Sequence, residues 1–238
     1  MLTRHTALSV NSSRLILRQL DLPPLPIPQL RQLLTWELQR YTPYQADTAE
    51  FDLLSLHLTP KQHTVLLAAV PKQVIGSLLT TLKLAKLRPF LLEPGIMSLF
   101  RWIQYHYDLS NDNAVILNLG TSSTNILVVS AGQPYIARTV LVKPDGLEGK
   151  QRLMAEIHRS LDFVQAYNDT CSKWHCFCAG QKANNSSFLH TLEKDLNIPV
   201  QGLRKDSSLN IDSTLFAVCL GLALGWWGGA APCSQVNS

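Results

Sequence analysis

The stretch Asn118-Leu119-Gly120-Thr121-Ser122-Ser123-Thr124 says most about the fold of this 238-residue chain. Two apolar runs flank it, residues 114–117 before it and residues 125–129 after it, and both are rich in β-branched side chains. Short, bounded runs of this kind predict two paired strands joined by a turn. The turn itself combines one glycine with four hydroxyl side chains.

A turn of this composition can bind phosphate. Gly120 can adopt a positive φ and lets a ligand approach the backbone closely. Successive backbone N–H groups and the side-chain hydroxyls would donate hydrogen bonds to phosphate oxygens. The hydroxyls belong to Thr121, Ser122, Ser123 and Thr124. An ordinary polar hairpin turn has the same composition, so local chemistry leaves both interpretations open.

The composition is that of an ordinary globular protein. The chain is 46% hydrophobic and 16% charged, which suffices for one large domain or two small ones with a substantial core. The net charge of +4 is modest and the basic residues are scattered, which argues against nucleic-acid binding and a polybasic membrane anchor. Residues 1–5 do not begin a signal peptide, so we expect a cytosolic protein. Residues 215–227 are too short to span a bilayer and predict a buried helix.

The five cysteines are an odd number, which does not favour a disulfide framework. Cys171, His175, Cys176 and Cys178 form the one cluster with a composition suited to metal binding. In a strand, however, Trp174, Cys176 and Cys178 would alternate onto one face. We therefore predict core thiols rather than metal ligands.

The predicted strands and helices alternate along the chain, which indicates an α/β architecture. The predicted strands are a strand pair at 6–20 with its turn at 11–13, then 51–58, 63–70, 90–93, 114–117, 125–129, 135–142, 174–178 and 199–203. The predicted helices are 29–41, 71–87, 95–107, 146–167, 186–196 and one from 214. In the second helix we expect Leu78, Leu79, Leu82 and Ala85 to face inward and the lysines at 83 and 86 to face solvent.

The order of these motifs resembles the PilM family of actin-like type IV pilus assembly proteins, over roughly residues 6–227. Residues 17–43, with Arg18-Gln19-Leu20-Asp21-Leu22-Pro23, Trp36-Glu37 and Tyr41-Thr42-Pro43, are similar to the subdomain inserted in that family. The other similar segments are residues 68–72 (strand-to-helix junction), 119–124 (second phosphate hairpin), 155–162 (long helix), 179–180 (nucleotide-base loop) and 216–223 (closing helix).

This resemblance implies an actin-like (ribonuclease H-like) ATPase fold with an inserted β-α-β-β subdomain. Residues 1–88 would form that subdomain with its connecting helix, and residues 89–227 would form the core with the second phosphate hairpin. Residues 228–238, rich in small residues, are predicted to be a disordered tail. Fold alone does not establish a function.

The resemblance also implies ATP, with Mg²⁺, in a central cleft. The residues it assigns to the nucleotide are Asn118, Gly120, Thr121, Ser122, Ser123, Thr124, Glu156 and Gly180, with Glu156 near the ribose. The implied partner is the N-terminal peptide of a PilN-like inner-membrane protein, bound beside the inserted subdomain at the cytoplasmic side of the pilus platform. Related members serve competence and DNA uptake, self-association is left open, and no direct nucleic-acid binding is expected.

Three departures from the family pattern bear on catalysis. Asn118 stands where the family has Asp, and a neutral amide is a poorer magnesium ligand and cannot accept a proton. The first phosphate hairpin is expected to be missing because the chain starts at the inserted subdomain. Gln181 and Lys182 follow Gly180 where the family has further glycines. We therefore expect weak or absent ATP binding and a non-catalytic scaffold, the alternative being a slow ATPase.

Several residues keep a second, structural interpretation. Trp36 and Tyr41 are either packing anchors or partner contacts. Glu156 is either a solvated helix carboxylate or a ribose ligand. Gly221 could serve close helix packing. A nucleic-acid binding protein, suggested by the competence relatives, would need basic stretches interleaved with aromatic residues, and the sequence has none.

Overall fold

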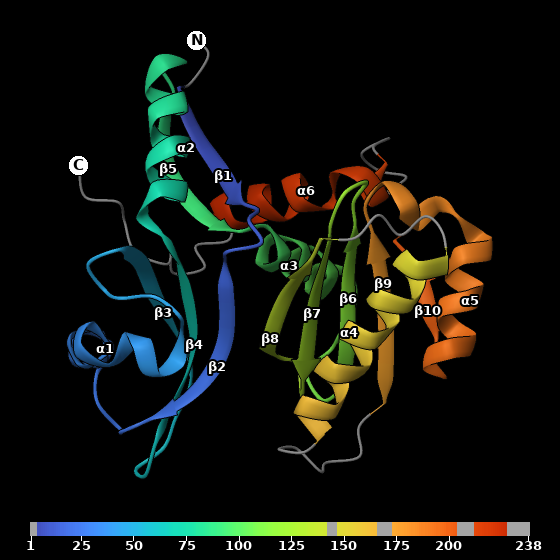
Figure 1. Ribbon diagram of the computed structural model, residues 1–238, viewed down its shortest axis with the longest axis horizontal. Coiled ribbons are helices and arrows are strands. Elements are labelled where there is room, and N and C mark those ends of the chain that lie inside the picture. The colour runs from blue at the N-terminus through green and yellow to red at the C-terminus, as the bar shows by residue number, and fades with distance from the viewer. Residues whose placement is uncertain (1–3, 142–146, 166–172, 204–211, 228–238) are drawn as a thin grey trace. The chain divides into compact units, whose positions relative to one another are not determined.

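The computed structural model describes residues 4–141, 147–165, 173–203 and 212–227. The tail predicted at 228–238 lies outside these residues. The chain divides into two compact units, one made of Met1–Gly95 with Gly225–Ser238 and the other of Ile96–Leu224. Figure 1 shows the elements of each unit.

A three-stranded antiparallel sheet and one helix dominate the first unit (Figure 1). The elements follow the order β2 (Ile16–Leu22), α1 (Ile27–Tyr41), β3 (Ala49–Leu58) and β4 (His63–Pro71). The central strand β4 pairs with β2 on one side and with β3 on the other. The predicted β-α-β-β subdomain and the hairpin of β3 and β4 are confirmed.

Helix α1 covers one face of this small sheet because its leucines recur every four residues. Leu30, Leu34 and Leu38 are at most 1% exposed and form a core with Leu67 of β4 and other apolar residues of the sheet. The helix ends where both the backbone N–H and the hydroxyl of Thr42 donate to the Leu38 carbonyl oxygen, at 2.9 and 3.1 Å. The sequence predicted this helix to within two residues at its start.

The strand pair predicted at residues 6–20 is wrong. Strand β1 (His5–Val10) pairs in parallel with β5 (Arg88–Pro94), while β2 pairs with β4. Leu20 and Leu22 of β2 are buried in the core beneath α1, and this burial fixes β2 in the small sheet. Local turn residues predicted a hairpin, but the pairing is set by contacts distant in sequence.

Helix α2 (Lys72–Leu84) links the small sheet to β5. Leu82 is buried, Leu78 and Leu79 are half-buried, and the lysines at 83 and 86 are exposed, as predicted. The inward placement predicted for Ala85 is wrong, because the helix ends at Leu84 and Ala85 is exposed.

In the part of the second unit that the structure describes, five strands lie in the order β10-β9-β6-β7-β8. Strands β6, β7 and β8 form an antiparallel meander, and β9 and β10 add in parallel beside β6. The strands are β6 (Asn113–Leu119), β7 (Thr124–Ser130), β8 (Gln133–Val140), β9 (Trp174–Ala179) and β10 (Val200–Gly202). Mixed pairing of this kind, with helices packed on it, is an α/β arrangement.

Helices α4 (Leu147–Gln165) and α5 (Ser186–Leu196) share a core with one face of this sheet. Leu153, Ile157 and Leu161 of α4 pack with Val115, Leu117 and Leu119 of β6 among others. Ala114 and Ile116, which alternate with these residues on the other face of β6, are also fully buried. A strand that is buried on both faces has a continuous apolar sequence, and the run at 114–117 predicted β6 for this reason.

Helices α3 (Gly95–His106) and α6 (Ser213–Trp227) approach each other closely at Gly221. A Cβ atom on Gly221 would overlap the Ser98 carbonyl oxygen of α3. The Gly221 carbonyl oxygen in turn accepts a hydrogen bond from the Arg101 guanidinium at 2.9 Å. Close helix packing therefore explains this glycine. Among the described residues no helix is both long and apolar enough to cross a membrane.

Candidate functional site

The turn between β6 and β7 is tight. The Gly120 N–H donates to the Ser123 carbonyl oxygen at 3.0 Å, and a Cβ on Gly120 would lie 2.7 Å from that oxygen. Gly120 does not have a positive φ, so the glycine is required for close backbone approach and not for a left-handed conformation. The paired strands predicted around this turn are confirmed.

The four hydroxyl side chains of the turn differ in exposure. Thr121 and Ser122 are exposed and Ser123 is half-buried. Thr124 is 1% exposed, and within the described residues its Oγ1 has no hydrogen-bond partner. A buried hydroxyl without a partner costs free energy. The exposed pair can meet a ligand from solvent, whereas Thr124 belongs to the interior.

Asn118 lies at the end of β6, between Asn125 of β7 and Ala179 of β9. Asn125 accepts a hydrogen bond from the Thr139 hydroxyl of β8 at 2.8 Å. Asn118, Asn125 and Thr139 are each half-buried, and they form a neutral polar row across three neighbouring strands. The row offers amide and hydroxyl groups but no carboxylate.

Gly180 packs directly against Asn118. It follows β9 with φ 91° and ψ 176°, a conformation that is nearly restricted to glycine. A Cβ there would lie 2.6 Å from the Leu119 carbonyl oxygen and 2.8 Å from the Asn118 Oδ1. Its N–H donates to the Thr214 carbonyl oxygen at 2.7 Å, which joins the end of β9 to the first turn of α6.

The first turn of α6 is capped by Asp212, whose Oδ1 accepts a hydrogen bond from the Thr214 N–H at 3.0 Å. The Thr214 hydroxyl donates to the Leu203 carbonyl oxygen at 2.9 Å. The structure therefore gathers the 118–124 turn, Gly180 and the start of α6 at one end of the sheet. Of the eight residues assigned to the nucleotide, seven lie in this group.

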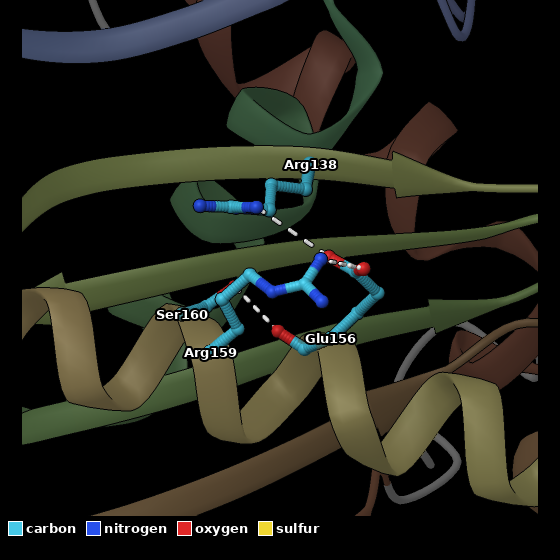
Figure 2. A network of polar contacts seen from close by, with 4 residues as sticks. All are labelled: Arg138, Glu156, Arg159 and Ser160. Carbon is cyan, nitrogen blue, oxygen red and sulfur yellow. Dashed lines mark hydrogen bonds and ion pairs between the residues drawn. The ribbon is translucent and has the colours of Figure 1, made fainter.

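Glu156 is the eighth, and it lies on the other face of the sheet. In the sheet, Arg138 of β8 lies opposite Ile126 of β7, which in turn lies opposite Leu117 of β6, so the three side chains share the face covered by α4. Asn118 is the next residue along β6, and its side chain therefore points to the opposite face. Figure 2 shows Glu156 reaching Arg138 of β8, at 3.4 Å, and Arg159 one turn further along α4.

The Glu156 carboxylate is thus held by two guanidinium groups, those of Arg138 and Arg159. The Ser160 hydroxyl also donates to the Glu156 backbone carbonyl at 2.7 Å (Figure 2). Glu156 is therefore an ion-paired helix carboxylate whose side chain is 25% exposed. These contacts clamp α4 to β8, and sequence reasoning missed Arg138, whose partner is 18 residues away.

Cys176 and Cys178 are fully buried in the core shared by α4 and α5, and Trp174 packs against the same core. The prediction of core thiols is confirmed for these two. The hydrogen bond with Cys176, together with burial, raises the pKa of the Cys178 thiol. Cys178 therefore stays a protonated, unreactive thiol at neutral pH. Cys171 lies outside the described residues.

Trp36 is 84% exposed on α1, so its interpretation as a packing anchor is wrong, whereas Tyr41 packs against the subdomain core. A groove of about 370 Å³ opens beside Trp36. Gln39 from the same helix and Gln45 and Asp47 from the following loop also line it. This surface has an aromatic ring, two amides and one carboxylate, a composition suited to binding a peptide segment.

The sequence matches no protein-family model and no curated protein sequence. Solved structures are similar to it. A chain of the "PilM-PilN type IV pilus biogenesis complex" matches with a TM-score of 0.78 at 18% identity, over 93% of this chain and 79% of that one. The chain has the actin-like ATPase fold. The resemblance to PilM stated from the sequence is confirmed at the level of the fold.

Two further solved structures are similar to this chain, with lower TM-scores. The cytoplasmic domain of EpsL, an inner-membrane component of the type II secretion system of Vibrio cholerae, matches with a TM-score of 0.54 and 13% identity, over 96% of this chain and 76% of that one. A Bacteroides thetaiotaomicron protein with an actin-like ATPase fold and unknown function has a TM-score of 0.50 and 11% identity, over 89% and 72%.

The turn fits a phosphate group only in part. The exposed hydroxyls of Thr121 and Ser122 can donate to phosphate oxygens, and the missing Cβ atoms of Gly120 and Gly180 keep the backbone close. The residue at the strand end is Asn118, a neutral amide, which does not suit a magnesium-dependent hydrolysis that needs a carboxylate. The exposed hydroxyls can donate hydrogen bonds to an anion, and Asn118 cannot act as a base.

Proposed function

We propose that this protein is a non-catalytic scaffold of type IV pilus or competence machinery that binds the N-terminal peptide of a PilN-like inner-membrane protein. The main support is the fold similarity to a chain of the PilM-PilN complex over 93% of the present chain. At that coverage most of the β2-α1-β3-β4 subdomain must lie within the similarity. The protein would sit on the cytoplasmic side of the inner membrane, held there by its partner.

The exposed Trp36 and its groove are the surface that we assign to the peptide. A large aromatic side chain that is 84% exposed gains free energy when a partner covers it. Each large apolar side chain that the peptide buries contributes roughly 1.5 to 3 kcal/mol, less the cost of ordering the peptide. An affinity of about 1 μM corresponds to about 8 kcal/mol, so three such anchors would supply most of it and hydrogen bonds to the peptide would have to supply the rest.

Calorimetric titration with the synthetic N-terminal peptide of the PilN-like protein from the same genome tests this proposal. We expect saturable binding that changes little when Mg-ATP is added, and no binding of a scrambled peptide. Trp36→Ala should weaken binding, whereas Tyr105→Ala, which removes another exposed ring in the other unit, should not. Absence of heat with a folded protein at about 100 μM peptide would refute the proposed partner.

A slow ATPase is the alternative. Saturation of a nucleotide site at a thousand times its dissociation constant would add about 4 kcal/mol of stability. For a chain of this size, each kcal/mol of added stability raises the melting temperature by about 2–4 °C. With a neutral Asn118 we expect Mg-ATP to raise it by only a degree or two. Asn118→Asp alone should not produce phosphate release. Release above background that disappears in Gly120→Val would favour the ATPase.

A further inference from the structure

Strand β3 forms the outer edge of the small sheet in the first unit. Among the described residues it pairs with β4 on one side only, and it is ten residues long. A free edge of this length presents unpaired N–H and C=O groups that can pair with a strand of another molecule. Figure 1 shows β3 beside β4 and near α1.

Two backbone groups of β3 that point away from β4 are hydrogen-bonded to side chains. The Phe51 carbonyl oxygen accepts a hydrogen bond from the Arg31 guanidinium of α1 at 3.1 Å. The Leu53 N–H donates to the Asp52 Oδ1 at 2.8 Å. In an antiparallel pair, alternate residues direct both backbone groups away from the neighbouring strand, so Phe51 and Leu53, two apart, face the same side.

A single ion pair occupies both of these groups. The Arg31 guanidinium that caps the Phe51 carbonyl also contacts the Asp52 carboxylate, and that carboxylate caps the Leu53 N–H. The Arg31 side chain is 39% exposed and that of Asp52 is 18% exposed. Partly exposed ion pairs contribute little to stability. The Arg31–Asp52 pair differs from an ordinary surface ion pair because it hydrogen-bonds two neighbouring backbone groups at the edge of the sheet.

The other half of β3 is protected by its shape. The register with β4 shifts between Ser55 and His57, which marks a β-bulge. A bulge twists a strand and interrupts regular pairing at a sheet edge. The regular pairing of β3 therefore runs over residues 49–55, and Arg31 and Asp52 act within that part.

We propose that the Arg31–Asp52 pair closes the β3 edge against strand addition by a second copy of this chain. Two identical edges can pair about a two-fold axis, antiparallel, with Leu53 facing Leu53 and Phe51 facing Ser55. Such pairing needs the Phe51 carbonyl and the Leu53 N–H from each copy. In each copy the ion pair already binds both of these groups, so four backbone groups are unavailable for the symmetric contact.

The test compares Arg31→Ala and Asp52→Ala with wild type by sedimentation equilibrium at rising protein concentration. We expect the variants to shift toward dimer at about 100 μM, beyond any association of the wild type. Arg40→Ala is the matched control, because it removes another partly exposed ion pair of the same helix, Arg40–Glu37 at 3.7 Å. Folding of each variant is checked by its melting curve.

Amide hydrogen exchange of residues 49–58 separates edge pairing from unfolding. Edge pairing slows exchange at Leu53 and Ser55 as concentration rises, whereas association through unfolded chains speeds it. Asp52→Asn, which retains an acceptor for the Leu53 N–H, should associate less than Asp52→Ala. Folded variants that associate no more than wild type, or that associate without slower exchange at β3, would overturn the proposal.

Discussion

Gly180→Ala is the substitution that most directly tests how the candidate site is assembled. Gly180 has φ 91° and ψ 176°, and a Cβ would lie 2.6 Å from the Leu119 carbonyl oxygen, a backbone atom of β6 that cannot move aside freely. The conformational strain alone costs about 1–3 kcal/mol. With the steric overlap added, we expect a loss of roughly 3 kcal/mol.

The matched control is Gly76→Ala in the exposed part of α2, where a Cβ would meet nothing within 4 Å. The same chemical change should stabilise its unit there by about 1 kcal/mol, because alanine favours helix over glycine. On the scale of about 2–4 °C per kcal/mol, Gly180→Ala should lower the melting temperature by roughly 6–12 °C and Gly76→Ala should raise it by a few degrees.

Differential scanning calorimetry measures both changes. A Gly180→Ala variant that melts with wild-type enthalpy at the wild-type temperature would refute the reasoning, because the Asn118–Gly180–α6 junction would then tolerate a side chain. Since Gly180 joins β9 to the start of α6 through its N–H, the same variant should also speed amide exchange at the 118–124 turn.

Three further outcomes are expected. Cys219, which is exposed, should react with a thiol reagent in the folded protein, while Cys176 and Cys178 react only on unfolding. Because folding raises the pKa of the Cys178 thiol, the unfolding free energy should fall as the pH rises above the ordinary thiol pKa of about 8.5. An unfolding free energy that stays constant over that pH range would contradict this. Thr124→Val removes a buried hydroxyl that has no partner among the described residues, so it should stabilise the protein by about 1 kcal/mol in urea unfolding, whereas a loss of stability would indicate a partner for that hydroxyl. Leu34→Ala should cost about 2–5 kcal/mol, and a loss below 1 kcal/mol would mean that α1 does not depend on its leucine stripe.

Local patterns predicted most of the elements. The leucine spacing of α1 and the apolar runs around Gly120 depend on neighbours close in sequence, and both were found with nearly correct bounds. Strand β1 was misassigned because its partner β5 is some eighty residues away. Nothing in a turn of polar residues specifies such a distant pairing.

Seven of the eight residues that the sequence assigned to the nucleotide lie together, and Glu156 lies apart from them. Asn118, Gly120 and Gly180 meet because β6 and β9 are parallel neighbours, which the motif order of an actin-like fold implies. Glu156 was assigned to the same group, but a helix position does not reveal which face of the sheet its side chain reaches. The Arg31–Asp52 pair joins a helix to a strand 21 residues later, and no periodic pattern marks it.

Recruitment to a membrane tests the central claim most directly. Vesicles carrying the full-length PilN-like membrane protein, oriented with its N-terminal segment outward, are mixed with this chain and sedimented, alongside vesicles whose protein lacks that segment. We predict that the chain sediments with the first vesicles and not with the second, equally with and without Mg-ATP, and that Trp36→Ala reduces the bound fraction. A folded chain that stays in the supernatant with both vesicle types would contradict the account.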